Sequence, residues 1–195
     1  MADFAVVLDS DVLFSINSTD LLLTLAQLGL YRPVWTERIL RAPVKFVPER
    51  REDLSETAIQ RRVDAMKRAR PDAMVVVPKE LEDVMTNHEG DRHVLAAAVH
   101  AGASVVVTNN LRHFSPEACE RHHVEAQSGD EFVLHLVSLD ALAVKRAVRI
   151  MSDRRNNPPV GVDEIFQRLK ALFPGAMGQL EIECGPPVGW NFEEN

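Results

Sequence analysis

Short runs of consecutive apolar residues alternate along the chain with segments whose apolar residues recur every three or four positions. Such runs lie at residues 4–8 and 74–77 and, directly after Ser104, at 105–107, and shorter strands are predicted at 33–35 and 124–126. Continuous apolar runs of this length are typical of strands that are buried on both faces of a parallel sheet. The alternation therefore predicts an α/β/α sandwich, in which helices cover both faces of a central parallel sheet.

Helical spacing of apolar residues predicts helices between these strands, over residues 18–28, 37–41, 53–70, 91–101 and 116–121. Thr36 is placed to cap the second of them. Pro43 must end or kink this helix, because proline lacks a backbone N–H and clashes with the preceding turn. Gly29 and Gly102 follow the first and fourth helices, as glycine commonly does at helix ends.

The C-terminal part of the sequence predicts an extension to this core. We expect a domain of residues 1–134 and an extension of residues 135–195. Helical spacing continues over 140–152 and 163–173, and the core fold does not explain a role for these helices. After Pro174 the chain is rich in glycine and proline, so a weakly ordered tail is predicted there.

Charge and length narrow the choice of partners. The chain has 195 residues, which is room for one domain with a small appendage. Its 22 basic and 29 acidic residues give a net charge of -7, so its overall field does not attract nucleic acid. Contact with RNA or DNA would need local basic patches. The candidates, each of a kind that is more often a solvated surface, are Arg50-Arg51, Arg61-Arg62, Lys67-Arg68-Arg70 and Arg154-Arg155.

The cysteine content and the N-terminus predict a cytoplasmic protein. Cys119 and Cys184 are too few for a disulfide framework, which indicates a reducing compartment. The N-terminus lacks the basic segment of a signal peptide. No stretch reaches the roughly 18 apolar residues that a membrane span requires. We therefore expect no association with a membrane.

Polar residues with oxygen ligands follow the predicted strands. Asp9 and Asp11 come directly after the first strand, Asn110 follows the strand at 104–107, and Asp91 begins a helix. Ligands bind at the carboxyl ends of the strands in open parallel sheets, so these groups are expected to meet there. Carboxylate and amide oxygens suit Mg²⁺ or Mn²⁺, and such an ion can promote phosphodiester cleavage. Asp11 capping a turn, Asp91 capping its helix and Asn110 binding loop backbone are alternatives that need no metal.

Three segments in this order give a specific resemblance. They are Val7–Leu13 (VLDSDVL), Gly90–Ala98 (GDRHVLAAA) and Val105–Phe114 (VVVTNNLRHF). Over roughly residues 4–134 the chain resembles the PIN domain, and most of all the VapC-type toxin ribonucleases of bacterial toxin–antitoxin pairs. The resemblance implies a PIN-like α/β/α fold and Mg²⁺- or Mn²⁺-dependent endoribonuclease activity. It also implies an RNA substrate, a small antitoxin partner and a homodimer.

The resemblance assigns roles to residues, with two departures from the family pattern. Asp9 matches the first acid of the family and Asp91 the third, so both are expected to bind the metal, and Thr108 matches a hydroxyl residue near the site. Ala42 stands where the second acid is expected, and Asn110 and His113 stand at the two candidate positions for the fourth. Asp9, Asp91 and Asn110 are the predicted catalytic residues, and Asp11, Glu37, Thr108 and His113 are weaker candidates, with Glu37 a substitute for the second acid. Weak Mg²⁺ binding and better Mn²⁺ binding follow from the missing charge.

Two other functions are open on the sequence. A degenerate PIN module could bind RNA or a partner protein without cleaving it, because two of four expected acids are absent. A haloacid-dehalogenase-like phosphatase is suggested by Asp9-Ser-Asp11 after a buried strand. That chemistry expects a lysine after the Thr108 motif, whereas the first lysine after Thr108 is Lys145.

Overall fold

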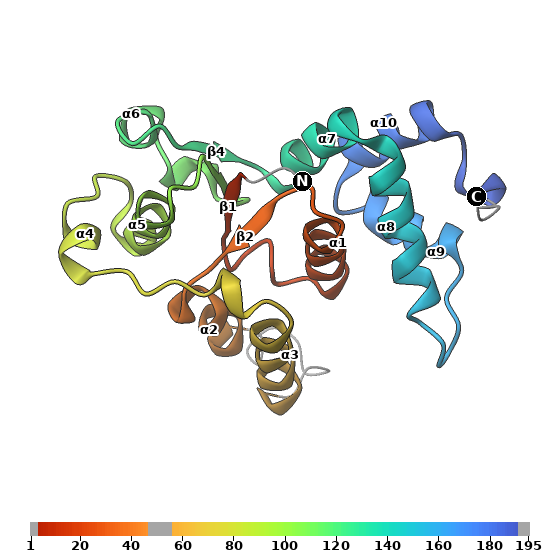
Figure 1. Ribbon diagram of the computed structural model, residues 1–195, viewed down its shortest axis with the longest axis horizontal. Coiled ribbons are helices and arrows are strands. Elements are labelled where there is room, and N and C mark those ends of the chain that lie inside the picture. Colours follow the sequence, from red (N-terminus) through yellow and green to blue (C-terminus); the bar gives the residue numbers. More distant parts are fainter. Residues whose placement is uncertain (1–3, 47–55, 191–195) are drawn as a thin grey trace. The chain divides into compact units, whose positions relative to one another are not determined.

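A computed structural model describes residues 4–46 and 56–190 (Figure 1). The chain divides into two compact units, the first formed by residues 1–14 and 31–128 and the second by residues 15–30 and 129–195. The change at 128 to 129 lies six residues before the boundary expected from the sequence, and the second unit also takes the helix that follows the first strand. Segments that are adjacent in the sequence therefore belong to different units.

The first unit is built on a four-stranded sheet. Its strands are β1 (Ala5–Leu8), β2 (Arg32–Val34), β3 (Val105–Val107) and β4 (Glu125–Gln127), in the order β2-β1-β3-β4. All three pairings are parallel. Every residue of β1 is buried, as its continuous apolar sequence requires. The parallel sheet with flanking helices confirms the predicted α/β fold class.

The register between the two central strands positions the polar residues that follow them. Leu8 lies opposite Val107 in the β1–β3 pair. The pairing continues one residue further, because the Asp9 amide donates to the Val107 carbonyl at 3.0 Å. On the other side of β3, the Thr108 amide donates to the Gln127 carbonyl at 2.9 Å. Asp9 and Thr108 are thereby fixed side by side by main-chain bonds.

Helices of the first unit are α2 (Glu37–Phe46), α3 (Glu56–Ala69), α4 (Lys79–Asp83), α5 (Arg92–Ala101) and α6 (Pro116–Glu120). Short 3-10 turns lie at η1 (Pro71–Ala73), η2 (Glu89–Asp91) and η3 (Leu111–His113). Helix α5 packs against β1, β2 and β3 and buries residues 94–98, which are Val-Leu-Ala-Ala-Ala. It ends at Gly102, whose φ of 62° is the left-handed conformation that glycine adopts without strain. This packing holds the start of α5 near the edge of the sheet.

Two predictions for this unit are wrong. Thr36 does cap α2, accepting a hydrogen bond from the Ile39 amide at 3.2 Å, but the helix runs to Phe46 instead of ending at residue 41, with Pro43 inside it. Proline lowers helix stability at one position without forbidding helix beyond it. Residues 74–77 are not a strand: Met74 makes a single bridge to Trp35, and Val76 is 87% exposed. An apolar run indicates that a segment prefers to be buried, but it does not determine which strand the segment pairs with.

The second unit contains helices from both ends of the chain. They are α1 (Ile16–Gln27), α7 (Gly129–Leu139), α8 (Ala141–Asp153), α9 (Val162–Lys170) and α10 (Pro174–Cys184), followed by the turn η4 (Pro187–Gly189). Helix α1 begins at Ile16, two residues before the predicted start at residue 18, and Ser15 caps it. Within residues 4–46 and 56–190, no helix has both the length and the apolar character to cross a membrane.

Arginines attach α1 to the end of α8. Arg155 donates to Asn17 at 2.9 Å and to Asp20 at 3.3 Å. Arg154 donates to Thr24 at 3.2 Å and also to a glutamine of α1. These bonds give Arg154 and Arg155, which were candidates for RNA contact, a structural role within the second unit.

Residues 174–190 are ordered in this structure, contrary to the weakly ordered tail expected there. Helix α10 packs against α7, α8 and α9. Its start is capped from α7, because the Asp130 carboxylate accepts from the amides of Gly175 and Ala176, each at 2.9 Å. A Cβ at position 175 would lie 2.9 Å from this carboxylate, so glycine permits the close approach. The glycine content that led to the prediction of a weakly ordered tail includes Gly175, which here allows a helix to be capped.

We predict that Asp130→Ala lowers the free energy of unfolding by about 1–2 kcal/mol, the usual cost of losing a helix cap. The physical reason is that two amides at the start of α10 lose their acceptor. Chemical denaturation followed by circular dichroism measures this change. Glu183→Ala, which removes an exposed side chain bonded to Gln179, is the matched control. Equal stability of the two variants would contradict the role given to Asp130.

Candidate functional site

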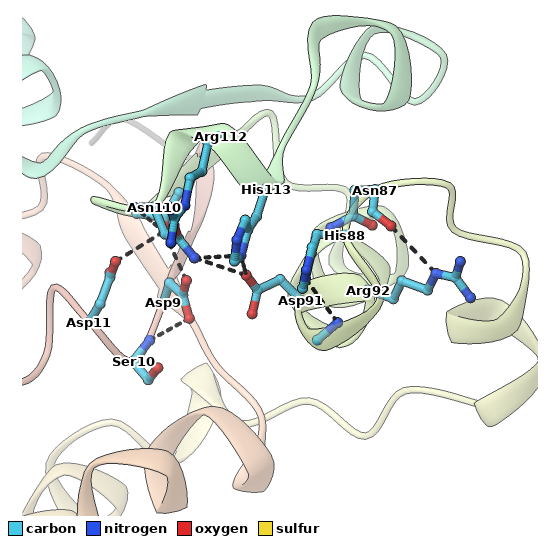
Figure 2. Close-up of polar contacts among 12 residues, drawn as sticks. Asp9, Ser10, Asp11, Asn87, His88, Asp91, Arg92, Asn110, Arg112 and His113 are labelled. Atoms are coloured by element: carbon cyan, nitrogen blue, oxygen red, sulfur yellow. Dashed lines mark hydrogen bonds and ion pairs between the residues drawn. The ribbon is translucent and has the colours of Figure 1, made fainter. Parts of the chain in front are cut away.

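Polar side chains converge at the carboxyl ends of β1 and β3 and at the start of α5 (Figure 2). Asp9 and Asp11 follow β1, Thr108 and Asn110 follow β3, and Asp91 stands immediately before α5. The site expected from the sequence is thus assembled from three separate segments of one unit.

Asp9 lies at the base of this site. This residue is only 4% exposed. One carboxylate oxygen accepts from the Ser10 amide at 2.6 Å, and the other accepts from the Thr108 hydroxyl at 2.9 Å. These two bonds fix the orientation of the buried carboxylate.

Asp11 reaches across to the segment after β3 rather than capping a local turn. Its Oδ2 accepts from the Asn109 amide at 2.9 Å and lies 3.3 Å from the Thr108 hydroxyl. The single hydroxyl proton of Thr108 cannot satisfy both carboxylates at once. Asp11 Oδ1 is buried and has no hydrogen-bond partner within the described part of the chain. Asp9 and Asp11 therefore present more negative oxygen than the surrounding donors satisfy.

Asp91 occupies the cap position of α5, yet its side chain makes no capping hydrogen bond. Its Oδ2 instead lies 2.7 Å from His113 Nδ1 and accepts from the Asn110 amide nitrogen at 3.3 Å. The Asn110 side chain also approaches His113 Nδ1 to 2.5 Å. Its main-chain amide donates to the Thr108 hydroxyl at 3.1 Å. A chain of contacts thus runs from Asp9 through Thr108 and Asn110 to Asp91.

Burial and mutual repulsion control the charge of this site. The pKa of Asp9 is raised from 3.8 to about 6, mainly by burial and next by the negative charge of Asp11. Burial likewise raises the pKa of Asp11, and Asp91 adds repulsion to both. Carboxylates that are costly to ionise in this way favour a cation beside them.

His88 joins the site although no sequence pattern indicated it. Its ring stacks on that of His113, with centroids 3.8 Å apart and planes inclined by 10°. The main-chain amide of His88 donates to the His113 carbonyl at 3.1 Å. One ligand atom from each of His88, Asp91 and His113 lies within 4.8 Å of the other two. His88 and His113 are 25 residues apart in the sequence, so no local motif could indicate that they pair.

Glu37 has other partners. Its carboxylate pairs with Arg41 at 2.7 Å and with Lys67, and these bonds lower its pKa. Among the described residues, no recorded contact joins Glu37 to Asp9, Asp11 or Asp91, so the structure gives no support to Glu37 as the substitute acid. The helix position of the missing second acid is held by Ala42, within α2.

The other basic candidates divide between structural and exposed residues. Arg62 donates to the carbonyls of Leu13 and Phe14, which fastens α3 to the segment after β1. Arg61 and Arg68 are exposed on α3, and Arg50 and Arg51 lie outside the described residues. Exposed cations on α3 remain candidates for RNA contact.

We predict that Asp9→Asn stabilises the metal-free protein at pH 7.5. Because the folded-state pKa of Asp9 is raised to about 6, its contribution to stability is complete below pH 4 and is lost as the pH rises through 6. Asparagine carries no such charge, and the gain at pH 7.5 is up to about 3 kcal/mol from a shift of about two pH units. Urea denaturation in EDTA at pH 5 and pH 7.5 measures it. A variant that is less stable than the parent at pH 7.5 would contradict the prediction.

Comparison with known proteins gives two matches. Residues 129–180, in the second unit, match the family described as the VapC50 C-terminal domain. A Mycobacterium tuberculosis protein named "Putative ribonuclease VapC50" is 35% identical over 112 residues, which are 56% of this chain and 66% of that protein. The match thus spans just under two thirds of the relative's length. No solved structure gives a significant match.

These matches agree with the resemblance found in the sequence. The family match covers the C-terminal helices, which the PIN-like core alone does not explain, and the fold of the first unit is the parallel α/β fold that the resemblance implies. The comparisons thus support a VapC-type protein, with a PIN-like first unit that carries the acidic site.

Proposed function

We propose that this protein is a divalent-metal-dependent endoribonuclease and the toxin of a type II toxin–antitoxin pair. The observation that carries the proposal is the meeting of Asp9, Asp11 and Asp91, from two distant segments, at the carboxyl edge of a parallel sheet. The name of the similar M. tuberculosis protein supports the ribonuclease activity.

The residues of the site fit a hard divalent cation. Asp9 and Asp91 are the proposed ligands, and Asp11 joins them because its buried Oδ1 has no partner among the described residues. Oxygen donors of this kind suit Mg²⁺ and Mn²⁺. Such an ion, when bound, would activate water and stabilise the leaving oxygen in phosphodiester cleavage.

Neighbouring residues would hold these carboxylates in place. The Thr108 hydroxyl orients Asp9 and approaches Asp11, and the Asn110 amide holds Asp91. We assign Asn110 to this positioning role, because its amide nitrogen rather than its oxygen faces the carboxylate. With Ala42 in place of the second acid, the site has less negative charge than the family pattern, so Mn²⁺ should bind better than Mg²⁺.

Because two of the four expected acids are absent, a catalytically inactive module is the alternative to the nuclease. In this alternative the Asp91 carboxylate is taken up by His113 and Asn110, as the contacts of 2.7 Å and 3.3 Å allow. The similarity to a VapC-type relative gives no support to the phosphatase alternative. Cleavage of RNA decides between a nuclease and a binding module.

The partners of the protein are also proposals. The resemblance to VapC-type toxins implies an RNA substrate, a small antitoxin that covers the acidic site, and assembly into a homodimer. The overall charge of -7 requires RNA to approach through local cations, and the exposed Arg61 and Arg68 of α3 are suited to that. A small antitoxin with a basic side chain would fit the unsatisfied carboxylates of Asp9 and Asp11.

We predict Mn²⁺-dependent cleavage of structured RNA that Asp9→Asn and Asp91→Asn each lower by at least about 100-fold, the scale of losing one group that stabilises transition-state charge. EDTA should abolish cleavage, and excess Mn²⁺ should restore it. The assay follows end-labelled RNA on denaturing gels. Expression of the parent protein without an antitoxin should also arrest bacterial growth, and the Asp9→Asn variant should not.

Glu37→Gln is the matched control, because it removes a carboxylate that is engaged by Arg41 and Lys67 rather than by the site. It should retain cleavage close to that of the parent. Cleavage by Asp9→Asn equal to that of the parent would show a contaminating nuclease. RNA binding without any cleavage in Mn²⁺ would favour the inactive module.

We predict that Asn110→Asp raises both Mn²⁺ affinity and cleavage while lowering the stability of the metal-free protein. The new carboxylate would lie beside Asp91, so repulsion is relieved only when a cation binds. Calorimetric titration with Mn²⁺ and thermal unfolding in EDTA measure the two effects. A fall in Mn²⁺ affinity would contradict the assignment of position 110 to the metal site.

A further inference from the structure

The His88, Asp91 and His113 side chains form a group that the acidic site does not require. His88 comes from the loop before η2, Asp91 from the start of α5, and His113 from η3 after the third strand (Figure 2). Their ligand atoms lie within 4.8 Å of one another. The His113 Nδ1 to Asp91 Oδ2 contact is 2.7 Å.

A second observation at this place comes from Asn87, the residue before His88. It is only 5% exposed, and neither its amide nitrogen nor its amide oxygen has a hydrogen-bond partner within the described residues. A buried amide without a partner is costly. A bound ion, with the water that accompanies it, would bring a partner for this amide.

The donor set indicates which ion is suited to this group. Imidazole nitrogen binds Zn²⁺, Co²⁺ and related transition metals, whereas Mg²⁺ prefers oxygen. Two histidines and one carboxylate are also the protein ligands of many zinc sites that keep a further position open. We propose that His88, Asp91 and His113 bind a transition-metal ion of the Zn²⁺ class and select it over Mg²⁺.

The stacked rings explain how the site would respond to the ion. The nitrogen lone pairs lie in the planes of the rings, and two nearly parallel planes whose centroids are 3.8 Å apart do not meet at one ion. His88 is exposed and accepts only a long bond of 3.3 Å from the Gly90 amide, whereas His113 Nδ1 lies 2.7 Å from Asp91. We therefore expect the His88 ring to tilt when the ion binds, which opens the stack. This movement gives a signal for metal binding that does not depend on activity.

The inference rests on the proposed function only for the role that the bound ion would have. Asp91 belongs to both groups, since it repels Asp9 and contacts His113. An ion held by the histidines would share this carboxylate with the acidic residues. The histidine at position 113 would then supply nitrogen where the family pattern expects an acid, and so change which metal the site selects.

The test is calorimetric titration of tag-free, chelator-treated protein with Zn²⁺ and, separately, with Mg²⁺. We expect one equivalent of Zn²⁺ to bind more tightly than Mg²⁺. His88→Ala and His113→Ala should each weaken Zn²⁺ binding at least about tenfold, the smallest loss usually seen when support for a metal ligand is removed. NMR of the histidine rings should show His88 and His113 shifting together as Zn²⁺ is added, because the stack opens.

His100→Ala is the matched control, because His100 is an exposed histidine at the other end of α5. It should bind Zn²⁺ as the parent does, and circular dichroism checks that all variants are folded. His113→Asp should shift the preference from Zn²⁺ toward Mg²⁺, since a nitrogen donor becomes an oxygen donor. Zn²⁺ binding that is absent in the parent, or unchanged in both His88→Ala and His113→Ala, would overturn the proposal.

These measurements separate the inference from the proposed function. Zn²⁺ binding is read without RNA, and RNA cleavage is read in Mn²⁺. Histidine-dependent Zn²⁺ binding without cleavage by the parent would remove the nuclease but keep the metal site. RNA cleavage that requires Asp9 would support the nuclease. If Zn²⁺ binding were at the same time unchanged in His88→Ala and His113→Ala, the proposed histidine site would be overturned.

Discussion

The contact between Asp9 and Thr108 is the constraint on which the site depends. Parallel pairing of β1 with β3 continues past Leu8 and Val107, so the residues that follow these two strands lie side by side. The Thr108 hydroxyl then binds the Asp9 carboxylate at 2.9 Å and approaches Asp11. Two carboxylates are thereby held together in a place where burial makes their charge costly, and the pKa of Asp9 rises to about 6. A site with this unsatisfied charge favours cations, whether metal ions or basic side chains of a partner.

The surroundings of Asp91 are an amide and an imidazole, because Asn110 and His113 are its side-chain contacts. Helix α5 leaves the Asp91 carboxylate free of capping bonds. The carboxylate contacts His113 and Asn110, and His88 stacks on His113. Part of the site therefore offers nitrogen where the family pattern offers oxygen. The balance of oxygen and nitrogen ligands decides which metal binds, since hard and borderline ions differ in their preferred donors.

The second unit is held together by its own core and its own polar contacts. Arg155 fastens the end of α8 to α1, and Asp130 of α7 caps α10. Trp190, after the last helix, is 3% exposed and meets Phe166 of α9 edge to face, with ring centroids 5.5 Å apart. Interactions of this kind show that residues up to 190 belong to the folded unit. The family match covers α7, α8 and α9 and ends within α10.

The sequence alone determined the α/β class, the strand at 4–8 and the three segments that carry the residues of the site, because these depend on local periodicity and on strand ends. It also indicated Asp9, Asp91, Asn110 and Thr108 through the resemblance to the PIN domain. Tertiary structure alone decided that residues 74–77 leave the sheet after one bridge, that α1 belongs with the C-terminal helices, and that His88 stacks on His113. Each of these depends on pairing between segments distant in the chain. The pattern of a single segment records its preference for burial, but not the segment that will cover it.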